Sequence, residues 1–242
     1  MEIERLFPDP GRVSAADDLR DLRLSEHAPD GRPYVVLNMI ESLDGRTTIN
    51  GTVSELTSPI DQARLFGLRA QADAVLVGAG TVRAERYRKV LPPEVEGPRP
   101  MMVICTNRVD LPEDLPLLDN PDVHVVITTS SDRSLGFETR ARVDYLRVPL
   151  AEGGGGVDAL AMCRALRDEY GVRSIVCEGG PRLNDDLFAA DLVDELFVAI
   201  APTLVGAGER TLIDAARTVG PRRARLVSAA TAEDYLYLRY AF

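Results

Sequence analysis

Apolar residues along this chain cluster into short runs that predict buried strands, with amphipathic helices between them. The segment "YVVLNMI" (34–40) is β-branched and apolar without a helical period, which is typical of a strand buried on both faces. Residues 58–71 carry apolar side chains at helical spacing, with Ser58 as a candidate N-cap and Pro59 at the first helical position, so they predict a helix. The run "AVLV" (74–77) follows as another strand. This order of strand, helix and strand predicts a parallel βαβ unit.

The same alternation continues to the end of the chain. Further short strands are expected at 101–105, 123–127 and 144–148, and a helix at 157–171. A second βαβ-like unit comprises a strand at 173–177, a helix at 182–191 and a strand at 194–201. The tail, 224–242, alternates around three tyrosines and predicts two antiparallel strands. Together these elements predict an α/β fold with a mixed, mainly parallel sheet, helices on both faces and antiparallel C-terminal strands.

The first 32 residues differ from the rest in composition. The stretches "FPDPGR" and "APDGRP" are rich in proline and glycine, and only a short helix around 14–24 is expected between them. We therefore predict an N-terminal arm with weak structure of its own over 1–32, followed by one domain over 33–242.

Composition and charge narrow the functional classes. The chain is 45% hydrophobic and 27% charged, no apolar run approaches the roughly 18 residues of a membrane span, and its start lacks the pattern of a signal peptide, so a cytoplasmic protein is expected. A net charge of −10 argues against nucleic acid or an anionic membrane as partner. Three cysteines without CxxC spacing and two distant histidines argue against a disulfide framework or a metal site.

Two glycine-containing turns follow apolar strands, in "VLVGAGTVR" and "IVCEGGPRL". In an open α/β sheet, ligands bind at such strand ends, where helix N-termini present free N–H groups to phosphate. The first turn lacks the G-x-G-x-x-G pattern because Arg83 stands at the third glycine, so Gly78 and Gly80 could equally form only a tight turn. The next strand ends in Thr106 and "NR", donors that favour a 2′-phosphorylated dinucleotide.

Four other residues are candidates for chemistry. Glu178 directly follows an apolar strand and precedes two glycines and a proline, which favours a functional site over an ordinary turn. Asn38, inside an apolar strand, should either hydrogen-bond to backbone or face a site. Asp44 could be a plain Asp-Gly turn residue, and Arg69 could be a solvated cation at a helix end or an anion ligand.

Five stretches occur in a characteristic order: "PYVVLNMIESLDGR", "LTSP", "LRAQADAVLVGAGTV", "CEGGP" and "DLVDELFVAIAPTLVGAG". From about residue 33 to the end, the chain resembles the riboflavin-biosynthesis pyrimidine reductases. The resemblance implies a dihydrofolate-reductase-like fold, NADPH as hydride donor, a homodimer, and reduction of the ribosyl group of a 5-amino-6-(5-phosphoribosylamino)pyrimidine to ribityl. The deaminase motifs H-x-E and P-C-x-x-C do not occur, so the resemblance implies a standalone reductase.

The resemblance also implies roles for individual residues. The candidate cofactor-binding residues are Gly78, Gly80, Thr81, Glu85, Thr106, Gly179, Gly180, Pro181, Arg182, Leu183 and Asn184. The candidate substrate-binding residues are Ser54, Arg69, Arg86 and Glu178. Asn38, Asp44 and Glu178 are the candidates for the chemical step, with Glu178 and Asp44 handling a proton or holding the sugar and pyrimidine.

The chain departs from the family pattern at two places. Asn38 stands where bacterial fused enzymes usually have lysine and archaeal and fungal members have asparagine, and "ERY" (85–87) stands where "DDP" is usual. The sequence leaves open whether the pyrimidine is the deaminated form. It also leaves open two other functions: reduction of another heterocycle, such as dihydrofolate or a pterin, and non-catalytic nucleotide binding.

Overall fold

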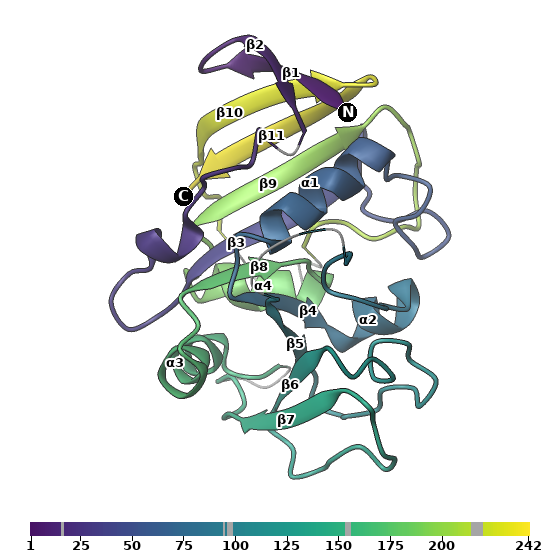
Figure 1. Cartoon of the computed structure of the whole chain (residues 1–242), viewed down its shortest axis with the longest axis vertical. Helices are drawn as coiled ribbons and strands as arrows, with labels where there is room; N and C mark the ends of the chain where they lie inside the picture. The colour runs from purple at the N-terminus through teal and green to yellow at the C-terminus, as the bar shows by residue number, and fades with distance from the viewer. Residues whose placement is uncertain (16, 94, 96–98, 153–155, 214–219) are drawn as a thin grey trace.

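One continuous eleven-stranded sheet runs through the computed structural model, which describes residues 1–15, 17–93, 95, 99–152, 156–213 and 220–242 (Figure 1). The strands are β1 (Glu2–Phe7), β2 (Gly11–Ser14), β3 (Tyr34–Ser42), β4 (Ala74–Gly78), β5 (Met101–Cys105), β6 (His124–Thr129), β7 (Arg142–Arg147), β8 (Ser174–Cys177), β9 (Glu195–Ala201), β10 (Arg225–Ala232) and β11 (Tyr235–Ala241). The helices are α1 (Pro59–Arg69), α2 (Ala79–Glu85), α3 (Ala159–Tyr170) and α4 (Pro181–Ala189), with a short 3-10 helix, η1 (Leu24–His27).

The sheet has a parallel part and an antiparallel part that meet at β9. The strand order is β2-β1-β10-β11-β9-β3-β8-β4-β5-β6-β7. All neighbours from β9 to β7 are parallel, whereas β11, β10, β1 and β2 are antiparallel to their neighbours. The predicted mainly parallel sheet and the antiparallel C-terminal strands are therefore confirmed.

The N-terminal residues differ from the prediction. β1 pairs with β10, with Arg5 opposite Ala230, and β2 pairs with β1, so residues expected to form a weakly structured arm belong to the sheet. Ile3 is only 2% exposed in a hydrophobic cluster with Tyr237. No α-helix is found among the described residues of 14–24, where residues 15 and 17–21 form turns between β2 and η1. Pairing with the last strands stabilises a segment whose own proline and glycine content predicts little structure.

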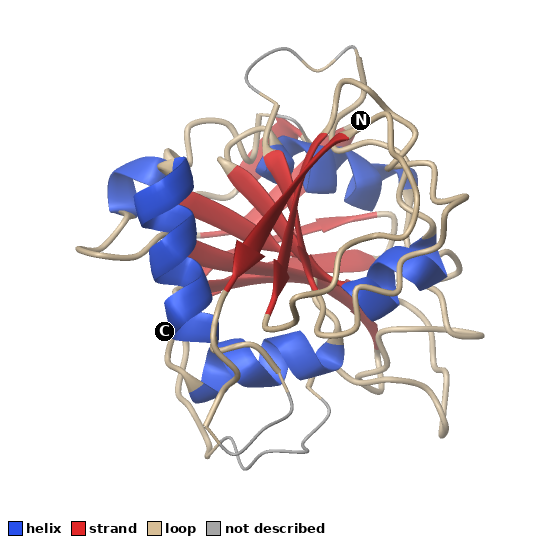
Figure 2. Cartoon of the chain, turned by 90° about the horizontal axis from the view of Figure 1, so that it is seen from below, coloured by secondary structure: helices blue, strands red, loops and turns tan. Residues whose placement is uncertain are grey.

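Helices cover both faces of the parallel part, as Figure 2 shows. Leu68 of α1 packs in a cluster with Val36 of β3, while Val35 of the same strand packs with Met162 of α3 on the opposite face. Alternate residues of one strand are thus buried on both faces, which explains the continuous apolar runs in the sequence. None of the described helices is long and apolar enough to cross a membrane.

Side-chain caps define the starts of α1, as predicted, and of α3, whose cap was not predicted. The Ser58 hydroxyl accepts a hydrogen bond from the Asp61 backbone N–H at 3.1 Å, and Pro59 occupies the first helical position. α3 begins at Asp158, whose carboxylate accepts from the Ala161 backbone N–H at 2.9 Å. The consequence for function lies in the sheet order: β3, β8, β4 and β5 are parallel neighbours, so the loops after them meet at one edge.

Candidate active site

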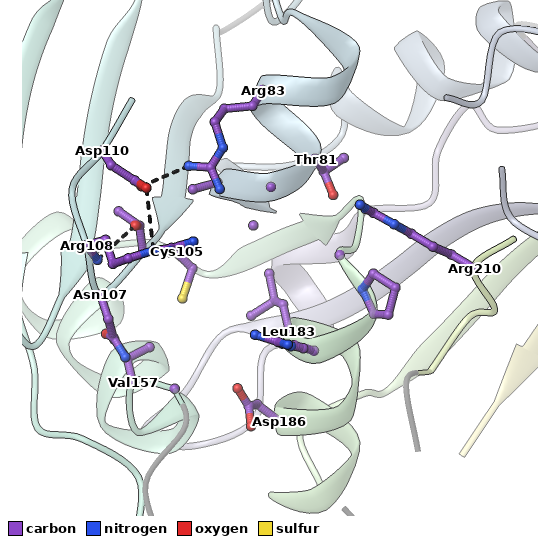
Figure 3. Close-up of a pocket in the computed structure, with 18 of the residues that line it drawn as sticks. Thr81, Arg83, Cys105, Asn107, Arg108, Asp110, Val157, Leu183, Asp186 and Arg210 are labelled. Carbon is purple, nitrogen blue, oxygen red and sulfur yellow. Dashed lines mark hydrogen bonds and ion pairs between the residues drawn. The ribbon is translucent and has the colours of Figure 1, made fainter. Parts of the chain in front are cut away.

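The larger of two cavities at this edge has a volume of about 620 Å³ and lies at the ends of β4, β5 and β8. Both glycine-containing turns line it, as do the residues after β5 (Figure 3). The Gly78 N–H donates to the Gly179 carbonyl at 2.9 Å, so a direct backbone hydrogen bond ties the two turns together. Two segments that are 100 residues apart in the sequence thus form one wall.

The backbone conformation requires glycine at one position of this wall but not at another. Gly180 has φ +95°, and a Cβ there would lie 3.3 Å from the Thr81 hydroxyl, so this turn requires glycine. Gly80 has no positive φ, and a Cβ there would meet nothing within 4 Å. A turn does not require glycine at position 80, and its missing side chain leaves room for a ligand to approach the backbone. This geometry favours the binding interpretation of "GAG" over a tight turn alone.

The start of α4 faces the larger cavity. Gly180 is its N-cap and makes no side-chain capping bond, and Pro181, Arg182 and Leu183 of the first turn line the cavity. The first N–H groups of an α-helix have no partner within the helix and carry the positive end of its dipole. This end of the cavity is therefore suited to a phosphate group.

Charged side chains lie around the larger cavity. Arg83 and Arg108 both approach the Asp110 carboxylate, at 2.9 Å and 3.4 Å, and Arg210 lies on the other side near Thr81 (Figure 3). Burial raises the pKa of the Cys105 thiol to about 12, so this lining cysteine stays protonated and unreactive. The cavity thus combines donors for an anion with an inert thiol.

The smaller cavity has a volume of about 440 Å³ and lies between α1, α2 and the ends of β3 and β8. Asn38, Arg69 and Glu178 line it together, although they come from three separate parts of the sequence. Thr81 lines both cavities. A ligand in the larger cavity can therefore meet a ligand in the smaller one beside Thr81.

Arg69 and Glu178 form a buried ion pair in the smaller cavity. Arg69 Nε donates to Glu178 Oε1 at 2.5 Å and Nη2 to Oε2 at 2.6 Å, and the two side chains are only 5% and 6% exposed. The Tyr87 hydroxyl also donates to Glu178 Oε2, at 2.6 Å. Burial alone would lower the pKa of Arg69, but the charge and hydrogen bonds of Glu178, together with the contribution of Tyr87, outweigh it and raise this pKa. The guanidinium is permanently charged and is already engaged by a carboxylate.

The structure brings most of the predicted site residues to the two cavities. Residues lining the larger one are Gly78, Gly80, Thr81, Thr106, Gly180, Pro181, Arg182 and Leu183. Residues lining the smaller one are Asn38, Arg69, Thr81, Glu85, Arg86 and Glu178. Glu85, expected at the cofactor together with the residues of the larger cavity, thus lines the smaller one, where it accepts a hydrogen bond from the Val53 N–H at 3.0 Å.

Four predicted residues lie outside both cavities. The Asp44 carboxylate accepts hydrogen bonds from the N–H groups of Val205 and Gly206, at 3.0 and 2.7 Å, and so anchors a loop. Asn184 is fully buried and donates to the Leu212 carbonyl at 2.7 Å. Ser54 is exposed, with its hydroxyl 2.9 Å from that of Thr52. Gly179 has φ +80° and shapes the turn without lining either cavity. The contacts predicted for these four residues stay predictions.

Sequence reasoning assigned no role to several lining residues. Tyr87 was visible only as a departure from the family pattern, and Arg210 and Thr211 reach the larger cavity from a loop after β9. In the sequence, the glycines and the arginine of "GAGER" (206–210) could have indicated a ligand-binding loop. No group of three or more metal-ligating side chains occurs in the described part of the chain.

Several known proteins with similar sequences or structures are named as reductases of riboflavin biosynthesis or of a pyrimidinone 5′-phosphate. The 2,5-diamino-6-ribosylamino-4(3H)-pyrimidinone 5′-phosphate reductase of Methanothermobacter thermautotrophicus is 30% identical over 187 residues, which cover 76% of this chain and 84% of that protein. The riboflavin biosynthesis reductase of Saccharomyces cerevisiae has a TM-score of 0.72 at 21% identity, covering 95% of this chain and 99% of that one. Acinetobacter baumannii RibD has a TM-score of 0.73 at 24% identity, covering 88% of this chain. These likenesses confirm the expected dihydrofolate-reductase-like fold class.

This chain spans 58% of the Acinetobacter protein, so the match concerns one part of that larger enzyme. The family model described as the RibD C-terminal domain matches residues 33–237, which is most of the chain and includes both cavities. The resemblance inferred from five short stretches is thereby confirmed, and the chain belongs to the RibD C-terminal domain family.

Proposed function

We propose that this chain reduces the ribosyl group of a 5-amino-6-(5-phosphoribosylamino)pyrimidine to a ribityl group, with NADPH as the hydride donor, in riboflavin biosynthesis. The observation that carries the proposal is the pair of cavities that meet at Thr81. One has the backbone donors that a dinucleotide needs, and the other has a buried carboxylate and a cationic rim. Relatives named as reductases of a pyrimidinone 5′-phosphate support the same substrate class.

The residues of the larger cavity fit a nicotinamide dinucleotide. The uncapped start of α4 and the open backbone at Gly80 would hold the pyrophosphate. Thr106 and Arg108, at the end of β5, would hold a 2′-phosphate, which favours NADPH over NADH. When bound, the cofactor supplies a hydride, and the chain contributes orientation and proton management.

The substrate would occupy the smaller cavity with its 5′-phosphate toward Arg86 and Arg88. Both side chains are exposed at the rim, and Arg88 makes no ion pair within the part of the chain that the structure describes. Arg69, expected to bind this phosphate, donates instead to Glu178 and to the Val90 carbonyl at 2.7 Å. We therefore assign the phosphate to the rim arginines and assign Arg69 to holding Glu178.

The reaction adds a hydride to C1′ of the ring-opened, imine-like sugar, and the adjacent nitrogen takes a proton to give the amine. Glu178 accepts three hydrogen bonds and suits the role of an anionic acceptor for a sugar hydroxyl or a protonated nitrogen. Glu85 lines the same cavity, and burial raises its pKa, so it is the candidate proton donor.

The direct test is an assay of purified protein with NADPH and each of the two pyrimidines, deaminated and 2,5-diamino, following loss of NADPH absorbance. We expect turnover with at least one of them, with the 2,5-diamino form preferred, as the names of the archaeal and yeast relatives suggest. Removing the 5′-phosphate should raise KM strongly. Turnover of dihydrofolate or a pterin without either pyrimidine would instead support a different heterocycle, and no turnover of any would support a non-catalytic nucleotide-binding protein.

The antiparallel part of the sheet supports a homodimer, which we include in the proposal. Leu236 of β11 is 41% exposed although it lies between two paired strands, and Ile200, Leu238 and Tyr240 on the same face are only partly buried. Such an apolar face marks a protein contact. Light scattering should give twice the 26.4 kDa chain mass, and Leu238→Glu should give a monomer. A monomeric wild-type protein would contradict this part of the proposal.

A further inference from the structure

Beside the ion pair in the smaller cavity lies Tyr87, a residue at which this chain departs from the usual family pattern. We propose that Tyr87 is a positioning residue for the reaction: together with Arg69, it fixes the Glu178 carboxylate so that one oxygen is left to accept a hydrogen bond from the substrate. This inference rests on the proposed function, because it names the residue that orients the carboxylate of that same site.

The hydrogen bonds to Glu178 are unequally divided between its two oxygens. Oε2 accepts from Arg69 Nη2 at 2.6 Å and from the Tyr87 hydroxyl at 2.6 Å, so both of its lone-pair positions are used. Among the described residues, Oε1 accepts only from Arg69 Nε, at 2.5 Å. Glu178 lines the smaller cavity. Among the groups described, Oε1 therefore keeps one lone pair free to accept a hydrogen bond from a ligand. On Oε2, the Tyr87 hydroxyl occupies the corresponding position.

Tyr87 is itself held from two sides. Its backbone carbonyl accepts from the Leu117 N–H at 2.9 Å, which ties it to the loop after β5. The Arg69 guanidinium lies 5.4 Å from the centre of its ring. The following residues bind the same arginine, since Arg69 Nη1 donates to the Val90 carbonyl at 2.7 Å. One short segment, 87–90, thus contacts both members of the ion pair and sets their orientation.

The Tyr87 hydroxyl stays protonated over any ordinary assay range. Burial, and then the negative charge of Glu178, raise its pKa well above the usual value of a tyrosine. It therefore acts as a hydrogen-bond donor and does not itself lose a proton in the reaction. A phenylalanine at this position would keep the ring and its contact with Arg69 but remove the donor.

A double-mutant cycle separates positioning from packing. Hydrogen bonds to charged groups are strong enough that Tyr87→Phe should lower kcat by about 10- to 100-fold, with the KM for NADPH unchanged. In a Glu178→Gln background, Tyr87→Phe should lower kcat by less than about 3-fold, because there is no carboxylate left to position. Tyr145→Phe is the matched control: its hydroxyl accepts from the Leu135 N–H at 2.8 Å, and it lines neither cavity.

A spectroscopic measurement tests the same contact without turnover. In protein labelled with fluorotyrosine, the Tyr87 resonance is identified by its loss in Tyr87→Phe, and it should shift in Glu178→Gln but not in Tyr145→Phe. Equal losses of kcat in the two backgrounds, or a resonance unmoved by Glu178→Gln, would overturn the inference. If the resonance shifts but the protein turns over neither pyrimidine, the contact between Tyr87 and Glu178 is supported and the proposed function is refuted.

Discussion

Replacing Arg69 by methionine removes one member of the buried ion pair while keeping an unbranched, apolar side chain in the helix. Glu178, whose side chain is 6% exposed, would keep the Tyr87 hydroxyl as a donor but lose both guanidinium bonds. Removing one partner of a buried ion pair costs about 3–5 kcal/mol, because the remaining charge stays buried without compensation. In a domain of this size each kcal/mol lowers Tm by about 2–4 °C, so Tm should fall by roughly 6–20 °C.

The assay is thermal and urea unfolding of four proteins: wild type, Arg69→Met, Glu178→Gln and the double variant. The double variant should recover much of the loss, since it buries no unpaired charge. The matched control is Arg83→Met, because Arg83 also pairs with a carboxylate, at 2.9 Å, but the two side chains are 32% and 44% exposed. That change should cost less than about 1 kcal/mol. Equal effects at Arg69 and Arg83, or additive effects of the two ion-pair substitutions, would refute the reasoning.

Three further substitutions test other parts of the site. Thr81→Val should weaken NADPH binding by about 5- to 10-fold, because one neutral hydrogen bond is lost. An unchanged affinity, measured by calorimetry, would mean that the cofactor lies elsewhere. Arg108→Ala should lower kcat/KM with NADPH by about 10-fold or more while leaving NADH unaffected; equal losses with both would argue against a 2′-phosphate contact. Hydrogen bonds from Ser42, Val205 and Gly206 lower the pKa of Asp44 from 3.8, so its stabilisation is present above that pH and lost as the pH falls. The Tm difference between wild type and Asp44→Asn should therefore shrink below about pH 4, while kcat at neutral pH stays within about 3-fold; a large loss of kcat would return Asp44 to the reaction.

Local pattern predicted the parallel part of the fold because each buried strand there carries its own signal. β4 is an apolar run, β3 is mostly apolar up to Ile40, and α1 has a serine cap and a proline start, so none of the three depends on distant residues for recognition. β1 and β2 carry no such signal: β1 pairs with β10, which is over 200 residues away, and β2 pairs with β1. The short helix α2 was also not expected, since Gly78 and Gly80 at its start disfavour helix.

The sequence indicated which residues belong to the candidate site but not which of them contact one another. Glu178 and Arg69 each stood out in the sequence, yet nothing local shows that residues 109 positions apart share hydrogen bonds. Asp44 illustrates the opposite case, because an Asp-Gly pair within a family motif is consistent with chemistry or with loop anchoring. The hydrogen bonds that the Asp44 carboxylate accepts from Val205 and Gly206, in a distant loop, could not be seen in the local pattern.

The pairing of β1 with β10 also has a consequence for how the chain folds. During synthesis, residues 2–7 are made more than 200 residues before their partner strand at 225–232, and β3 must likewise wait for β9. Contacts of such high sequence separation slow folding, because closing a long loop costs entropy before any pairing is gained. Until β9 is made, the backbone N–H and C=O groups on the edge of β3 that will meet β9 are therefore unpaired, and we expect chaperone dependence to be greatest in this interval.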